Sequence, residues 1–294
     1  MPTGKPRALP AVMLLAGAVL TWAHAEEPLA VAARPPPEHR NFLACPILQD
    51  TATVPCWMAD YAGERYFLGV QTDSGGWSPP YLGHKALIEG IVVSGPRICG
   101  GIPLTSNYPQ SPLPSGSADG RPLPNPPVTS PMRELDAACT TMLPADLQYH
   151  IAARRGPGPN TAASALRPPP APASLQTPTP PFRARTFTLT YDFDSEVAGK
   201  TIGEALKAVQ YARAIDAHRI TLIGYRGATL LSDGALAQEI PNIAALRVRE
   251  LAAAVTKLGI PSGTTLAERS IDEPEPADGV TDPQRRRAEI IVTP

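Results

Sequence analysis

Apolar and polar residues follow two periods in the first part of the C-terminal third of the chain. Apolar and polar side chains alternate over residues 187–193, as on a strand with one buried face. Apolar residues then recur at helical spacing over 202–212, which predicts a helix with one apolar face.

The same two periods continue to the last residue. A strand is predicted over 219–225, a second helix over 242–261 and a closing strand over 286–294. Gly259 and Pro261 end the second helix, because glycine and proline are typical of the residues after a helix. Strands that alternate with helices predict a sheet covered by helices.

The region from residue 42 to 150 has a different pattern, rich in short β-type runs. Residues 56–72 predict a hairpin, and 84–101 predict a strand in which Gly90 marks a bulge. Residues 132–147 predict a short helix that ends at Pro144. We interpret this region as a small β-rich domain, with a barrel of the oligonucleotide/oligosaccharide-binding type as one option for its topology.

Proline is the one unusual feature of the composition, with 37 residues that cluster. Clustered proline indicates linkers, because it fixes φ and removes a hydrogen-bond donor. We therefore expect a disordered lead-in over 26–41 and a proline-rich linker over 151–183, between the β-rich domain and a C-terminal domain over 184–294.

Residues 1–25 have the layout of a secretory signal peptide. Lys5 and Arg7 precede a short apolar run, and "AHA" places small residues before Glu26. The run is too short to span a bilayer, and we expect no transmembrane segment in the mature chain. The predicted location is the periplasm, with association to the outer membrane as a further option.

The four cysteines are an even number in a chain predicted to be exported, which indicates two disulfides. They are Cys45, Cys56, Cys99 and Cys139. Three pairings are open, and nothing in the spacing decides between them. We favour Cys56–Cys99 with Cys45–Cys139. No CxxC or HxxxH spacing occurs, so we expect no metal site.

Charge and motifs narrow the class of function. The net charge is −1 and the pI is about 6.5, which argues against a nucleic-acid partner. The histidines are scattered, and no nucleophile elbow or phosphate-binding glycine pattern is present. We predict a non-enzymatic protein with no catalytic residues and no cofactor.

Five stretches of the C-terminal third share their order and spacing with a known family. They are "YDFDS", "ITLIGY", "LRVRELAAAVTKLGIP", "DEPEP" and "RRRAEIIVTP". Together they resemble the OmpA-like domain, a periplasmic module that binds peptidoglycan in many envelope proteins. The resemblance implies an α+β fold class, with a βαβαβ-type C-terminal domain and an envelope protein of a Gram-negative bacterium.

The family's ligand is the free end of a diaminopimelate side chain, which carries an ammonium beside a carboxylate. Such a group requires an acid for the ammonium and a guanidinium for the carboxylate. The family's arginine matches Arg247. Helical projection supports its importance, because Arg247 falls within the apolar arc of its helix while Arg249 points to the opposite side.

The family's acid is missing, because Arg226 and Gly227 stand in its place. The connection that follows is longer than in the family and contains Asp233 and Glu239, either of which could supply the charge. Both also have an ordinary interpretation: Asp233-Gly234 is a typical turn pair, and Glu239 before a proline could be an exposed loop acid.

Two functions follow from this comparison. In the first, the protein associates with the peptide stem of peptidoglycan through Arg247 with Asp233 or Glu239. In the alternative, Arg247 pairs internally with Glu273 or an acid of the insertion, and the protein is a periplasmic interaction or assembly scaffold with envelope proteins as partners.

Overall fold

A computed structural model describes residues 34–71, 79–106, 116–117, 123–147, 151–152 and 180–294. The predicted signal peptide, the first half of the predicted lead-in and most of the predicted linker lie outside these residues. Within the described part of the chain, no helix combines the length and the apolar character needed to cross a membrane.

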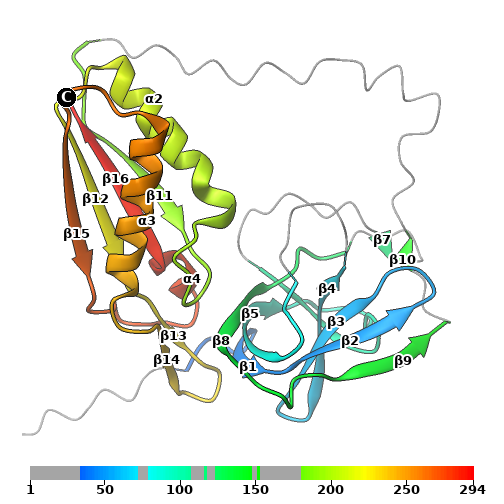
Figure 1. Ribbon diagram of the computed structural model, residues 1–294. Helices are drawn as coiled ribbons and strands as arrows, with labels where there is room; N and C mark the ends of the chain where they lie inside the picture. Colours follow the sequence, from blue (N-terminus) through cyan, green and yellow to red (C-terminus); the bar gives the residue numbers. More distant parts are fainter. Residues whose placement is uncertain (1–33, 72–78, 107–115, 118–122, 148–150, 153–179) are drawn as a thin grey trace, which may run out of the picture. The chain divides into compact units, whose positions relative to one another are not determined.

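The N-terminal half is built from strands (Figure 1). They are β1 (His39–Ala44), β2 (Pro46–Thr51), β3 (Cys56–Tyr61), β4 (Glu64–Val70), β5 (His84–Val92), β6 (Ile102–Thr105), β7 (Gly116–Ser117), β8 (Val128–Leu135), β9 (Met142–Asp146) and β10 (Ile151–Ala152). The predicted hairpin over 56–72 is confirmed as β3 and β4. Strand β1 begins at His39, inside the segment that was predicted as a lead-in.

Six strands form a ring, in which β1 and β2 follow each other as one bent strand. Strand β5 pairs with β1 and β6, β6 runs parallel to β4, and β4 pairs with β3. Strand β3 pairs with β2, which follows β1 after a single residue, Cys45. With β1 and β2 counted as one strand, this ring of five strands forms a barrel, and its oligonucleotide/oligosaccharide-binding type stays a prediction. We call residues 39–147 the barrel domain.

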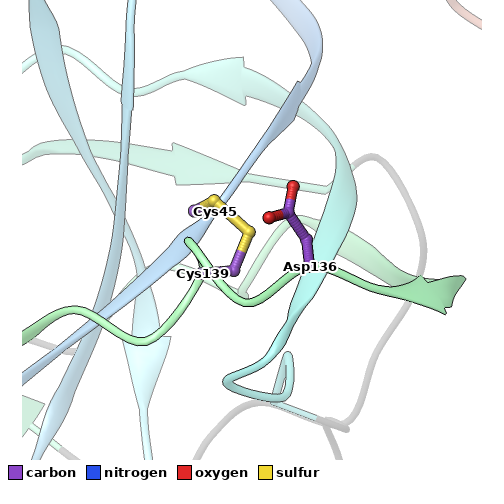
Figure 2. A group of neighbouring side chains, drawn as sticks. All are labelled: Cys45, Asp136 and Cys139. Carbon is purple, nitrogen blue, oxygen red and sulfur yellow. A yellow bond between two sulfur atoms is a disulfide. The ribbon is translucent and has the colours of Figure 1, made fainter.

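Two apolar clusters fill the barrel domain. The first contains Phe42, Trp57, Tyr66, Leu68 and Leu104, among other buried side chains. The second contains the Cys56–Cys99 disulfide beside residues of β2, β3 and β4. The other disulfide joins Cys45 and Cys139 (Figure 2), so the structure contains the two pairings that we favoured.

Two local predictions for this domain are wrong. Residues 132–147 form no helix, because β8 pairs with β5 and β9 pairs with β2, and this pairing overrides a weak helical pattern. Gly90 lies in regular register opposite Arg40 rather than in a bulge. A Cβ at Gly90 would lie 2.8 Å from the Cβ of Pro127, so the glycine allows a close approach.

The C-terminal domain combines a mixed sheet with helices, which confirms the α+β class at this level (Figure 1). Its main elements are β11 (Arg185–Thr190), α2 (Gly203–Ala214), β12 (Arg219–Tyr225), α3 (Ile243–Leu258), β15 (Thr265–Ile271), α4 (Asp282–Arg285) and β16 (Arg287–Thr293). A short 3₁₀ helix, η1 (Gly199–Ile202), precedes α2. The sheet order is β11-β16-β12-β15.

Helices α2 and α3 lie side by side on one face of this sheet and share its apolar core (Figure 1). At the end of β12, Gly224 allows α3 to come close, because a Cβ there would lie 2.2 Å from the carbonyl oxygen of Ala244. This close approach brings the first turns of α3 to the end of β12.

A short hairpin stands between β12 and α3. Its strands are β13 (Ala228–Leu230) and β14 (Leu236–Gln238), which pair antiparallel. Gly234 has a φ of +90° at its tip, a conformation that favours glycine. We call residues 228–238 the insertion hairpin, because they lie within the connection that the sequence comparison predicted to contain an insertion.

Candidate functional site

Arg247 lies in the second turn of α3 and is completely buried, with 0% of its side chain exposed. The prediction that it faces the apolar side of its helix is therefore confirmed. Arg249 on the same helix has 70% of its side chain exposed, which also agrees with the helical projection. The guanidinium of Arg247 does not reach water, so it needs partners within the protein.

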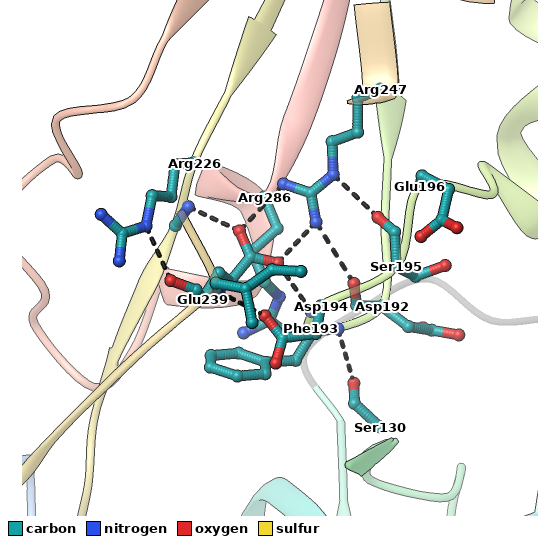
Figure 3. Close-up of polar contacts among 12 residues, drawn as sticks. Ser130, Asp192, Phe193, Asp194, Ser195, Glu196, Arg226, Glu239, Arg247 and Arg286 are labelled. Carbon is teal, nitrogen blue, oxygen red and sulfur yellow. Dashed lines mark hydrogen bonds and ion pairs between the residues drawn. The ribbon is translucent and has the colours of Figure 1, made fainter. Parts of the chain in front are cut away.

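Those partners come from three segments of the chain (Figure 3). The Nε atom donates to the Ser195 carbonyl at 2.9 Å, and one terminal nitrogen donates to the Tyr225 carbonyl at 2.7 Å. The other terminal nitrogen donates to the Asp192 carbonyl at 3.4 Å. Each terminal nitrogen also donates to the carboxylate of Glu239. A guanidinium has five N–H donors, and all five are engaged here.

Glu239 follows directly after β14 and is as buried as Arg247, with 0% exposed. Its two carboxylate oxygens accept hydrogen bonds from the terminal nitrogens of Arg247 at 2.5 and 2.9 Å. They also accept from the backbone N–H of Gly227 at 2.6 Å and of Asp194 at 2.9 Å. The two guanidinium contacts form a charge-assisted bidentate pair, and two backbone amides complete the four donors around this carboxylate.

Gly227 provides the space for this carboxylate. A Cβ at Gly227 would lie 3.2 Å from Glu239 Oε2 and 2.5 Å from Arg286 Cγ. Gly227, which the resemblance aligns with the family's acid, therefore leaves room for the Glu239 carboxylate beside it. Arg226 binds the backbone of Glu239, because its Nε donates to the Glu239 carbonyl at 2.7 Å.

Two further residues of the "YDFDS" stretch line the pair. The ring of Tyr191 lies 4.7 Å from the Arg247 guanidinium carbon, and burial raises the pKa of Tyr191 to about 12. Burial also raises the pKa of the Asp194 carboxyl, which accepts from the Ile240 backbone N–H at 2.7 Å. Tyr191 and Asp194 have no periodic signal that marks them as site residues, although both lie in the stretch "YDFDS".

The structure separates the candidate acids. Glu239 lies against Arg247, so the interpretation as an exposed loop acid is wrong for this residue. Asp233 is exposed at the tip of the insertion hairpin, where it accepts from the Ala235 backbone N–H at 2.9 Å. This is the turn role that its sequence neighbour Gly234 indicated. Glu273 is exposed and does not pair with Arg247.

One group of possible metal ligands occurs among the described residues, at Cys45, Asp136 and Cys139 (Figure 2). The two cysteines are bonded to each other, so neither offers a thiolate. Asp136 accepts from the Ala138 backbone N–H and lies 3.4 Å from the Lys85 ammonium. These contacts explain the position of the Asp136 carboxylate without a bound ion.

No protein-family model and no curated protein matches the sequence. Among solved structures, the OmpA-like domain of FopA1 from Francisella tularensis subsp. tularensis SCHU S4 is similar with 13% identity and a TM-score of 0.29, covering 38% of this chain and 73% of that chain. A MotB-like protein from Desulfovibrio vulgaris is similar with 17% identity and a TM-score of 0.27, covering 37% and 75%.

Proposed function

We propose that this chain is a non-enzymatic protein of the cell envelope whose C-terminal domain acts as an interaction and assembly scaffold with its ligand site closed. The observation that carries the proposal is the pairing of Arg247 with Glu239. Both side chains are 0% exposed, and every donor of the guanidinium is already used within the protein.

The site is closed by a group that competes for the same donors as a ligand. The resemblance assigns Arg247 to the carboxylate of a peptide stem, and in the structure a carboxylate of the chain itself takes those donors. A ligand would have to displace Glu239 from four hydrogen bonds. Displacement would also leave buried groups unpaired, which costs free energy.

The envelope location rests on the disulfides and on the predicted signal peptide. Two disulfides stabilise the barrel domain, and such bonds persist in oxidising compartments such as the periplasm. An exported protein with a small binding-type barrel and a closed C-terminal site fits an assembly role better than attachment to the cell wall.

Peptidoglycan association is the second candidate, and the position of Glu239 favours it. Its carboxylate lies beside Gly227, where the family has its acid. If the pair opened, an acid and a guanidinium would be available together for the two charges of a diaminopimelate end. This function requires an open form of the site.

Co-sedimentation of the full chain with purified peptidoglycan sacculi tests the proposal. We expect the native protein to stay in the supernatant, together with the Arg249→Ala control, whose substitution is exposed on the same helix. Sedimentation of the native protein that is lost in Arg247→Met and Glu239→Gln, both shown to be folded by thermal melting, would overturn the closed-site proposal in favour of peptidoglycan association.

A further inference from the structure

The insertion hairpin contacts the barrel domain through two hydrogen bonds between Ser232 and Asn41, one in each direction. The Ser232 N–H donates to the Asn41 carbonyl at 2.8 Å, and the Asn41 N–H donates to the Ser232 hydroxyl at 2.9 Å. The Asn41 amide nitrogen also donates to the carbonyls of Leu230 at 3.1 Å and Gly279 at 2.7 Å. Asn41 is 2% exposed, so these hydrogen bonds are shielded from water.

Two other residues of the hairpin have partners in the barrel domain as well. The Thr229 hydroxyl donates to Glu89 on β5 at 2.9 Å. The side chain of Leu231 packs in one cluster with Leu87, also on β5. Thr229 to Ser232 therefore contact strands β1 and β5, while the Leu230 backbone N–H donates to Asp282 of α4 at 2.9 Å.

Glu239 lies at the other end of the same hairpin. Strand β14 pairs with β13 from Leu236 to Gln238, and Glu239 is the next residue. Its backbone N–H donates to the Gly227 carbonyl at 3.2 Å. The pairing of the two strands thus transmits the position of β13 to the carboxylate that reaches Arg247.

The hairpin is too small to fix its own position. Each of its strands has three residues, and an isolated two-stranded hairpin is at best marginally stable in water. Its placement must therefore come from the surfaces against which it packs. The contacts from Asn41 and Glu89 supply such a surface.

We propose that the barrel domain controls the Arg247 site by fixing the insertion hairpin in the position that delivers Glu239. The proposal rests on the closed site described above and adds what keeps it closed. Contacts that exist only in the closed form favour that form, and losing them shifts the population toward an open form in which Arg247 is accessible. The site and the barrel domain are then coupled through β13 and β14.

Chemical modification of arginine in the full-length protein tests this coupling. Phenylglyoxal reacts with accessible guanidinium groups, and mass spectrometry gives the ratio of Arg247 to Arg249 modification. Arg249 is an internal reference, since it is exposed on the same helix. We expect a low ratio in the native protein and a rise of roughly tenfold for Asn41→Ala, Ser232→Ala or Thr229→Val, as loss of a buried hydrogen bond implies.

Controls separate the two proposals. Glu239→Ala removes the closing carboxylate and should raise the ratio, whereas Asp60→Ala, in an exposed ion pair of the barrel domain, should not. If Arg247 reacts like Arg249 in the native protein, the closed-site proposal fails. If native Arg247 is protected, Glu239→Ala exposes it and the three hairpin-contact variants remain at the native ratio, control by the barrel domain is overturned while the closed site stands.

Hydrogen exchange distinguishes local opening of the Arg247 site from global unfolding of a variant. The amides of β11 and β16 pair within the central sheet and should stay protected in every variant. The Gly227 and Asp194 amides, which donate to Glu239, should exchange faster in the Glu239→Ala and hairpin-contact variants than in the native protein. If Asn41→Ala unfolds the chain, the test of control by the barrel domain rests on Ser232→Ala and Thr229→Val.

Discussion

Arg286 and Glu89, 197 residues apart in the sequence, form a bidentate ion pair with both side chains buried. Two terminal nitrogens of the arginine lie 3.0 and 2.6 Å from the two carboxylate oxygens. The pair links a residue next to the last strand with strand β5.

Replacing Glu89 by alanine should strongly destabilise the protein. Removal of one partner leaves a buried guanidinium unpaired, which costs about 3–5 kcal/mol of unfolding free energy. Chemical denaturation of the full chain measures the loss. Asp60→Ala is the matched control, because its pair with Arg65 is exposed and should contribute less than about 1 kcal/mol. Equal losses in the two variants would contradict a special role for the buried pair.

A double-mutant cycle should show strong coupling between Arg247 and Glu239. Each of Arg247→Met and Glu239→Leu leaves one buried charge and should cost about 3–5 kcal/mol. The double variant removes both charges, so its loss should be clearly smaller than the sum of the two. Some loss should persist, because the Gly227 and Asp194 amides lose their acceptor. Additive losses measured by denaturation would refute the coupling.

Two glycine-to-alanine substitutions should have opposite effects on stability. Gly224→Ala places a Cβ 2.2 Å from the Ala244 carbonyl oxygen, and such overpacking costs about 1–3 kcal/mol or more. Gly203 begins α2 with a φ of −58° and has open space around its missing Cβ, so Gly203→Ala should stabilise by about 0.4–1 kcal/mol. Thermal melting of both variants checks the contrast, which a destabilised Gly203→Ala would break.

Asp278 should make the protein less stable as the pH falls below 4. Burial raises the pKa of Asp278, but hydrogen bonds from Thr281 and Val280 and the charge of the nearby Arg285 lower it more. The resulting pKa of Asp278 is about 2, compared with the ordinary value of 3.8. Its stability contribution is therefore present above pH 3.8 and is lost as the pH falls through about 2. Asp278→Asn should flatten this part of the melting-temperature profile.

The comparison must use the difference between the native and Asp278→Asn profiles. Burial raises the pKa of Asp194 and Asp282, and the contributions of these carboxyls have the opposite sign. They are present below 3.8, the ordinary value, and are lost as the pH rises through the raised pKa values. Coincident native and variant profiles between about pH 4 and 2 would contradict the prediction for Asp278.

The sequence predicts the elements of the C-terminal domain whose period is strong. Strand β12 and helix α3 match the predicted ranges closely, and the burial of Arg247 follows from its place in an apolar arc. Strand β15 was not predicted, because its residues Thr265–Ile271 show no alternation of buried and exposed positions. Its pairing with β12 decides its conformation.

The partner of Arg247 could be narrowed from the sequence but not chosen. Asp233 and Glu239 both lie in the long connection, and a local pattern identifies Asp233 as a turn residue. The burial of Glu239 depends on the hairpin register and on contacts with Asn41 and Glu89, far away in the sequence. Long-range contacts of this kind leave no periodic signal.

The disulfide between Cys45 and Cys139 closes a covalent loop around most of the barrel domain. Any single cleavage of the backbone between these two residues leaves the two fragments covalently joined by this disulfide, so they do not separate without reduction. Cleavage between Cys56 and Cys99 leaves the fragments joined by both bridges. A protease in the same compartment could therefore cut this part of the protein once without separating β1 from the C-terminal domain.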